Sequence, residues 1–137
     1  MRRYAREVAF SLTFEYLFTK EKNDLGLDLF EKKYLTGDDV QYIKDTYDGV
    51  VSQFDALQEK AASLAKGYKL ERIYKVDLAI LILAIYELSN TDIPLEVCIN
   101  EAVELAKKFS TDKSVGFVNG ILAQVNKIWD EERCFYG

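Results

Sequence analysis

Histidine is absent from this 137-residue chain, which also has only one proline, two cysteines and seven glycines. Without histidine, the chain lacks the commonest general base, the commonest metal ligand and every nucleophile that depends on an imidazole. It also lacks a glycine-rich phosphate loop of the GxxxxGK[ST] or GxGxxG type. Any catalysis would have to rest on carboxylates alone. We therefore expect a binding protein that is not an enzyme and that needs no metal or cofactor.

The scarcity of proline and glycine, together with long apolar periodicities, favours an all-α fold. A chain of this length with 49% hydrophobic residues is expected to form one domain, residues 1–137, with a real core. The apolar spacing predicts a compact bundle of about seven helices. The first three helices are expected at 3–18, 25–34 and 40–52. The apolar pattern then breaks near 53–55 and continues as a fourth helix to 67. The last three helices are expected at 70–89, 94–109 and 114–131.

Cysteine usage and hydrophobic runs point to a reducing, aqueous compartment. Cys98 falls in a predicted helix and is expected in the core, and Cys134 lies far from it, so no disulfide framework or metal spacing is present. The longest uninterrupted apolar run, 78–86, is too short to cross a bilayer. The charged N-terminus lacks the apolar segment of a signal peptide. We expect a cytoplasmic protein with no membrane association.

The distribution of charge matters more than the net charge of −5, which alone argues against a nucleic-acid-binding domain. Arg2, Arg3 and Arg6 cluster at the start of the first predicted helix, where the helix dipole disfavours positive charge. Guanidinium groups pair with phosphates and stack on bases, and Tyr4 and Phe14 could add stacking platforms. The simpler alternative is that terminal arginines only add solubility and that these aromatic rings belong to the core.

A second informative region is the run 93–109, which is followed after a short polar gap by 117–122. It predicts two helices joined by a tight turn. Glu101 and Glu104 lie one helical turn apart and could converge on one site. The alternative favoured by the sequence is that Glu104 pairs with Lys107 or Lys108 on a solvated face, while Glu101 braces a neighbouring helix.

Three segments of the chain resemble the NusB family of bacterial transcription antitermination factors. They are 2–9, 76–88, and 93–107 with its continuation at 117–122, and the resemblance extends over nearly the whole chain. It implies a compact helical bundle made of two packed helical subdomains. It also implies binding of boxA-type single-stranded RNA together with NusE, a ribosomal protein. Family members act in an RNA polymerase antitermination complex that promotes processive transcription of ribosomal RNA operons.

The resemblance also implies site residues, although the chain departs from the family pattern at two positions. Ile82 stands where many members carry an arginine, and Ser110 replaces a common glycine. The RNA-contacting residues implied are Arg2, Arg3, Arg6, Phe14, Asp77 and Phe117. The partner-contacting residues implied are Thr111, Asp112, Lys113 and Ser114.

Two other functions remain open at this point. NusB-like domains also precede ribosomal RNA cytosine methyltransferases, but this chain ends after the helical region, so we expect no methyltransferase. The other alternative is a non-enzymatic, protein-binding helical adaptor with weak or no RNA binding. The net negative charge and the replacement of a family arginine by Ile82 both support this alternative. Some family members self-associate, so a homodimer is open as well.

Overall fold

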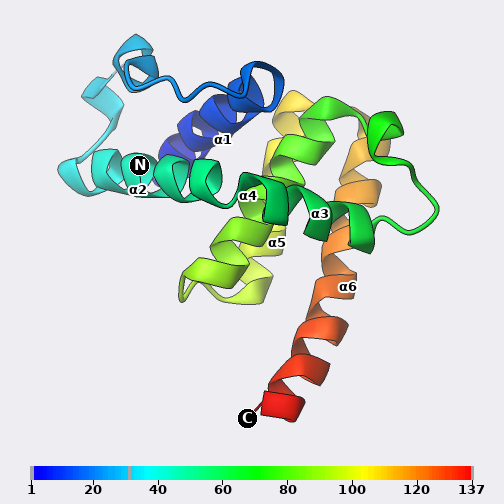
Figure 1. Ribbon diagram of the computed structural model, residues 1–137. Helices are drawn as coiled ribbons and strands as arrows, with labels where there is room; N and C mark the ends of the chain where they lie inside the picture. Colours follow the sequence, from blue (N-terminus) through cyan, green and yellow to red (C-terminus); the bar gives the residue numbers. More distant parts are fainter. Residues whose placement is uncertain (1, 31, 137) are drawn as a thin grey trace.

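The computed structural model describes the backbone of residues 2–30 and 32–136 and the side chains of residues 2–30 and 32–125. Over this part of the chain the regular structure is entirely helical, with six α-helices and three short 3-10 helices (Figure 1). The α-helices are α1 (Arg2–Thr19), α2 (Gly37–Ser52), α3 (Phe54–Leu64), α4 (Lys75–Asn90), α5 (Leu95–Phe109) and α6 (Asp112–Tyr136). The 3-10 helices are η1 (Gly26–Leu29), η2 (Lys32–Tyr34) and η3 (Leu70–Arg72).

Helix α4 lies at the centre of the bundle, as the sequence predicts for a helix that is apolar nearly all round. It contacts α1, α2, α3, α5 and α6. Leu78, Ile80 and Leu81 are fully buried, and so is Ile82, the residue that replaces a family arginine. Because Ile82 is sealed in the core, this position offers no charge and no exposed surface to a ligand.

Helix α1 joins two hydrophobic clusters, which confirms the expected pair of packed helical subdomains. The larger cluster surrounds α4 and includes Phe10 and Leu17 of α1. The smaller cluster packs α1 against α2 and η1 and contains Val8, Leu12 and Ile43. The two faces of α1 therefore pack against different parts of the protein.

Helix α6 contributes the apolar stripe that its spacing predicts. Val118, Leu122 and Val125 are buried in the larger cluster. Trp129 and Cys134 lie outside the described side chains. No helix in the described part of the chain is both long enough and apolar enough to span a membrane.

The helix predicted over 25–34 is wrong: this stretch forms η1 and η2, which reduces the α-helix count from seven to six. The Asn23 side chain accepts a hydrogen bond from the Leu25 amide (3.1 Å) and begins a turn instead of a helix. Leu27 is buried, but Leu25 and Leu29 are strongly exposed. The segment therefore lacks the continuous apolar face that stabilises an α-helix.

The boundaries of α2 follow from local chemistry. The N-cap of α2 is Thr36, whose hydroxyl accepts a hydrogen bond from the Asp39 amide (3.0 Å). The Asp39 carboxylate accepts in return from the Thr36 amide (3.1 Å), which completes a capping box. The predicted break before α3 is confirmed at Gln53.

Candidate functional site

The three N-terminal arginines occupy the first two turns of α1 but have different environments. Arg2 and Arg3 are about half exposed, and each faces one carboxylate. Arg2 Nε lies 3.6 Å from Asp39 Oδ1, and Arg3 Nη2 lies 3.3 Å from Glu101 Oε2. The Arg2 guanidinium also lies over the Tyr42 ring, 4.3 Å from its centroid. These two cations sit at the surface in pairs that water screens.

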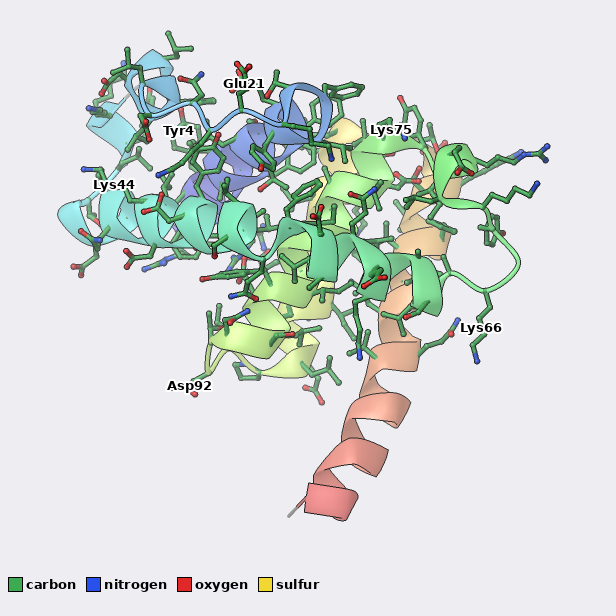
Figure 2. All side chains as sticks on the ribbon, in the orientation of Figure 1. Tyr4, Glu21, Lys44, Lys66, Lys75 and Asp92 are labelled. Atoms are coloured by element: carbon green, nitrogen blue, oxygen red, sulfur yellow. The ribbon has the colours of Figure 1, made fainter. Side chains whose placement is uncertain are left out.

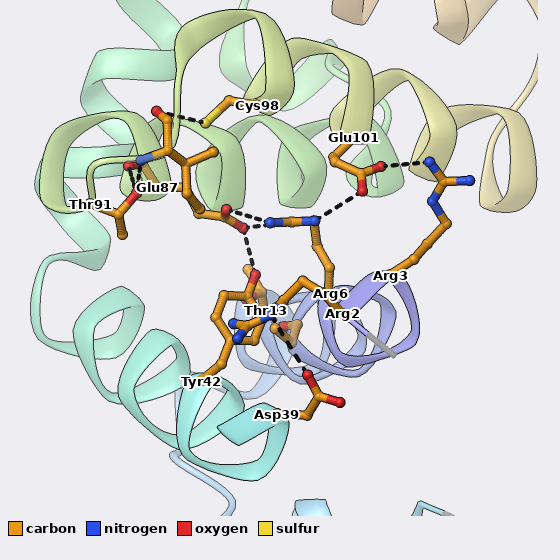
Figure 3. A network of polar contacts seen from close by, with 12 residues as sticks. Arg2, Arg3, Arg6, Thr13, Asp39, Tyr42, Glu87, Thr91, Cys98 and Glu101 are labelled. Carbon is orange, nitrogen blue, oxygen red and sulfur yellow. Dashed lines mark hydrogen bonds and ion pairs between the residues drawn. The ribbon is translucent and has the colours of Figure 1, made fainter. Parts of the chain in front are cut away.

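Arg6 is buried and makes three charge-assisted hydrogen bonds (Figure 3). Its Nε and Nη2 donate to the two carboxylate oxygens of Glu87 at 3.0 and 3.1 Å, which is a bidentate pair. Its Nη1 donates to Glu101 Oε1 at 3.1 Å. The Tyr42 hydroxyl donates to Glu87 Oε1 at 2.7 Å. The guanidinium is held inside the protein, so Arg6 braces α1 against α2, α4 and α5.

The same network explains the shifted pKa values of its members. Burial alone lowers the pKa of Arg6, but the hydrogen bonds and charge of Glu87 outweigh it and raise the pKa above its ordinary value. Burial, followed by the charge of Glu87, raises the pKa of Tyr42. Burial also raises the pKa of the Cys98 thiol to about 11. At neutral pH Arg6 is therefore charged, while Tyr42 and Cys98 keep their protons.

Side chains of α1 and α5 meet in several pairs, although α4 is the helix against which both of them pack. Arg3, near the start of α1, pairs with Glu101 in the middle of α5, whereas Glu7 of α1 pairs with Lys108 near the end of α5. A groove of about 290 Å³ between the helices is lined by Arg3, Lys107 and Lys108 together with acidic side chains. The prediction that Glu104 pairs with Lys107 or Lys108 is confirmed by a 3.4 Å contact between Glu104 Oε1 and Lys107 Nζ.

Beyond this groove the surface becomes aromatic. Phe109, at the end of α5, stacks on Phe10 of α1 with ring centroids 5.1 Å apart. Phe10 stacks on Phe14 at 6.0 Å, and Phe14 meets Phe18 edge-on at 5.1 Å. Phe10 is buried, Phe14 is partly buried and Phe18 is exposed. Phe14 thus packs in the core and is also partly exposed at the surface. From the sequence, a core position and a surface stacking platform were two alternative roles for this residue.

Asp77 is buried in the first turn of α4 and holds the turn between α5 and α6. Its Oδ1 accepts a hydrogen bond from the Ser110 hydroxyl, and its Oδ2 accepts from the Ser114 hydroxyl at 2.9 Å. Ser114 is further joined to Thr111 by a hydroxyl contact of 2.8 Å. Asp77 and Ser114 are therefore inaccessible to a large ligand and instead fix the shape of the turn.

The other residues of this turn are exposed. Thr111, Asp112 and Lys113 face solvent, and Phe117 is partly buried against the Tyr68 ring, with centroids 5.2 Å apart. A second groove, of about 340 Å³, runs between this turn and the segment before α4.

The predicted site residues thus lie around the turn between α5 and α6 and in two groups along α1. The arginines mark its start, and Phe14 lies twelve residues later, about 18 Å along a helix that rises 1.5 Å per residue. Phe10 of α1 stacks on Phe109 and so links α1 to the turn held by Asp77, because Phe109 immediately precedes that turn. Lys107, Lys108 and the groove beside Tyr68 were not predicted as parts of the site; the basic and aromatic residues of 66–75 were the available signal.

The described part of the chain has no cluster of three or more His, Cys, Asp or Glu side chains that could hold a metal ion. Glu101 and Glu104 do not converge on one site, because Glu101 binds Arg3 and Arg6 while Glu104 binds Lys107. The prediction that Glu101 braces a neighbouring helix is confirmed. The arrangement thus presents cations and aromatic rings to a partner, and Glu101 and Glu104 act as separate ion-pair partners.

Comparison with known proteins agrees with this architecture. The NusB family model matches residues 3–127. The transcription antitermination protein NusB of Acetivibrio thermocellus is 43% identical over 129 residues, covering 93% of this chain and 89% of the relative. A crystal structure of T. maritima NusB superposes with a TM-score of 0.83 at 29% identity, over 93% of this chain and 91% of that one. A structure of the antitermination factors NusB and NusE in complex with double-stranded RNA shares the fold, with a TM-score of 0.79 at 24% identity, over 93% and 96% of the two chains. On these grounds the chain belongs to the NusB family.

Proposed function

We propose that this protein is a transcription antitermination factor that binds boxA-type single-stranded RNA together with the ribosomal protein NusE. In this role it joins the RNA polymerase antitermination complex and promotes processive transcription of ribosomal RNA operons. Membership of the NusB family supports the proposal, as does the antitermination function of its relatives. A protein of the same fold has been crystallised with NusE and RNA, which makes the two partners the natural ones to test.

The observation that carries the proposal is the surface along α1 and α5. Arg3, Lys107 and Lys108 line one groove, and the Lys108 ammonium lies 5.6 Å from the centroid of the Phe109 ring. From Phe109 the aromatic row continues along α1 to Phe14. Single-stranded RNA binds to this combination of cations for its phosphates and aromatic faces for its bases.

Carboxylates of the protein hold these cations in the absence of RNA, as Glu101 holds Arg3 and Glu7 holds Lys108. Phosphates must replace these carboxylates, so we expect moderate affinity that falls steeply with salt. If three phosphates are neutralised, log K should change with log salt with a slope of about −2 for a single strand. Arg6 enters the proposal as a positioning residue, because Glu101 binds it and Arg3 at once.

NusE is proposed to contact the turn between α5 and α6. Thr111, Asp112 and Lys113 are exposed there, while Ser114 supports the turn through Asp77. In this proposal the three exposed residues contact NusE, and Ser114 maintains the shape of the turn.

The test is fluorescence anisotropy with a labelled boxA-type single strand, a scrambled strand and a duplex, each at two salt concentrations with and without NusE. The expected result is sequence-dependent binding of the boxA strand that tightens with NusE. Arg3→Gln should weaken it several-fold, whereas Lys44→Gln, an equal charge change at an exposed site on α2, should not. A heterodimer that forms but does not bind RNA would reject the proposal and leave the protein-binding adaptor.

A further inference from the structure

A groove at the other end of the bundle combines exposed aromatic rings with unpaired cations. Its walls come from the segment around η3 and from the start of α6, and it has a volume of about 340 Å³. Tyr68, Arg72 and Tyr74 form one wall, and Lys113 and Phe117 form the other. We call it the Tyr68 groove. Neither the family resemblance nor the proposed function assigns Tyr68 or Arg72 to a site.

The aromatic rings of this groove are available to a ligand. Tyr68 is 56% exposed and Tyr74 is 54% exposed, although both are large side chains that proteins tend to bury. The Tyr68 ring meets Phe117 edge-on, which leaves part of each ring face open to a second ring. Aromatic faces exposed in a groove are suitable platforms for stacking of nucleobases.

The cations of this region also differ from those elsewhere in the protein. No ion pair joins Lys66, Lys69, Arg72, Lys75 or Lys113 to any residue that the structure describes, whereas Arg3 and Lys108 on the α1–α5 surface are both paired. Within the segment 66–75 the single acidic residue is Glu71, against four basic ones. In a chain of net charge −5, this region is a local basic patch that can attract a polyanion.

The position of Asp77 decides how a nucleotide would lie. Its buried carboxylate lines the groove and already accepts hydrogen bonds from Ser110 and Ser114, so it repels a phosphate from the interior. Arg72 and Lys113 are exposed and stand on opposite walls. This arrangement favours a base inside the groove and its phosphate at the rim.

We infer that the Tyr68 groove binds a nucleotide of single-stranded RNA, with the base stacked on Tyr68 beside the Phe117 ring and the phosphate held by Arg72 at the rim. The inference rests on the RNA binding proposed above and extends the RNA contact from the α1–α5 surface to the far side of the α5–α6 turn. Arg72 forms no ion pair with any residue that the structure describes, so a phosphate can bind it directly. Arg3 on α1 must first release Glu101.

The first test is binding of a fluorescein-labelled boxA-type single strand to the full chain with NusE, measured by anisotropy. Tyr68→Ala should weaken binding at least 5-fold, the lower limit for loss of one stacked base, whereas Tyr68→Phe keeps the ring and should bind like wild type. Arg72→Gln should make the salt slope less negative by about 0.7. Lys44→Gln is the matched charge control, because Lys44 and Lys66 lie at opposite ends of the molecule (Figure 2).

A second test locates the base directly. The same strand with single 5-iodouridine substitutions is irradiated in complex with the protein, and crosslinked peptides are identified by mass spectrometry. A crosslink to Tyr68 or Phe117 supports the inference. Crosslinks confined to α1 with unchanged affinity of Tyr68→Ala would overturn the inference but leave the proposed function standing. Absence of RNA binding by wild type would overturn both, and loss of NusE binding alone in the groove variants would make the groove a protein-docking site instead.

Discussion

Replacing Arg6 with methionine tests the buried network most directly. The change removes a guanidinium that donates three hydrogen bonds, two to Glu87 and one to Glu101. Methionine fits a comparable volume but leaves the Glu87 carboxylate buried, with the Tyr42 hydroxyl as its remaining described donor. An uncompensated charge in this position is the main source of the expected loss of stability.

The magnitude follows from the geometry. Each hydrogen bond to a charged group is worth about 1.5–3 kcal/mol, but the three bonds are not additive and burial of the ions opposes them. Removing one partner of a buried ion pair costs about 3–5 kcal/mol, a large part of a total stability of roughly 5–15 kcal/mol. With a urea m-value of about 1.5–2 kcal/mol/M, a loss of about 3 kcal/mol lowers the unfolding midpoint by about 1.5–2 M.

The assay is urea unfolding at pH 7 followed by circular dichroism at 222 nm. Arg6→Lys keeps the charge but loses the bidentate geometry, so it should fall between wild type and Arg6→Met. Arg3→Met is the control, because its side chain is 59% exposed and the loss should stay within about 0.5 kcal/mol. If Arg6→Met and Arg3→Met unfold at the same urea concentration, the assignment of Arg6 as a structural brace is refuted.

Three further predictions concern the scaffold. Thr36→Ala removes the hydroxyl half of the capping box with Asp39 and should cost about 1 kcal/mol in the free energy of unfolding, measured by urea titration. Gly49→Ala should lower the melting temperature despite the better helix propensity of alanine, because its methyl group would collide with the Tyr86 ring and overpacking costs about 1–3 kcal/mol; an unchanged or raised melting temperature would contradict this close packing. Cys98, whose pKa is raised to about 11 by burial, should resist alkylation by iodoacetamide at pH 8 in the folded protein and react in urea, as read by mass spectrometry of its peptide.

The sequence predicts the elements whose signal is local. Helix α4 is apolar on all sides over 78–86, and that property alone places it at the centre of a bundle. The turn between α5 and α6 is likewise visible as a short polar gap between two amphipathic stretches. The helix predicted over 25–34 failed because periodicity in this segment does not reveal that Leu25 and Leu29 lack a surface to pack against.

The different fates of the three arginines could not be read from the sequence. Locally, Arg6 looks like Arg2 and Arg3, and its burial depends on Glu87 and Glu101, which lie 81 and 95 residues away. One signal was available: Glu87 directly follows the apolar run of α4, and a carboxylate in such a place needs a cation as partner. The Tyr68 groove was missed because its two walls come from segments more than 30 residues apart.

The long sequence separation within the Arg6 network has a consequence for synthesis of the protein on the ribosome. Arg6 is translated before its partner, and its contact with Glu101 must wait for 95 further residues. At a bacterial elongation rate of about 5–20 residues per second, the interval is about 5–20 s. During that interval α1 can already pack against α2, but the hydrogen bond from Arg6 to Glu101 cannot form. Arg3 at the surface and the buried Arg6 share Glu101, so the contacts that distinguish them are complete only when α5 has been translated.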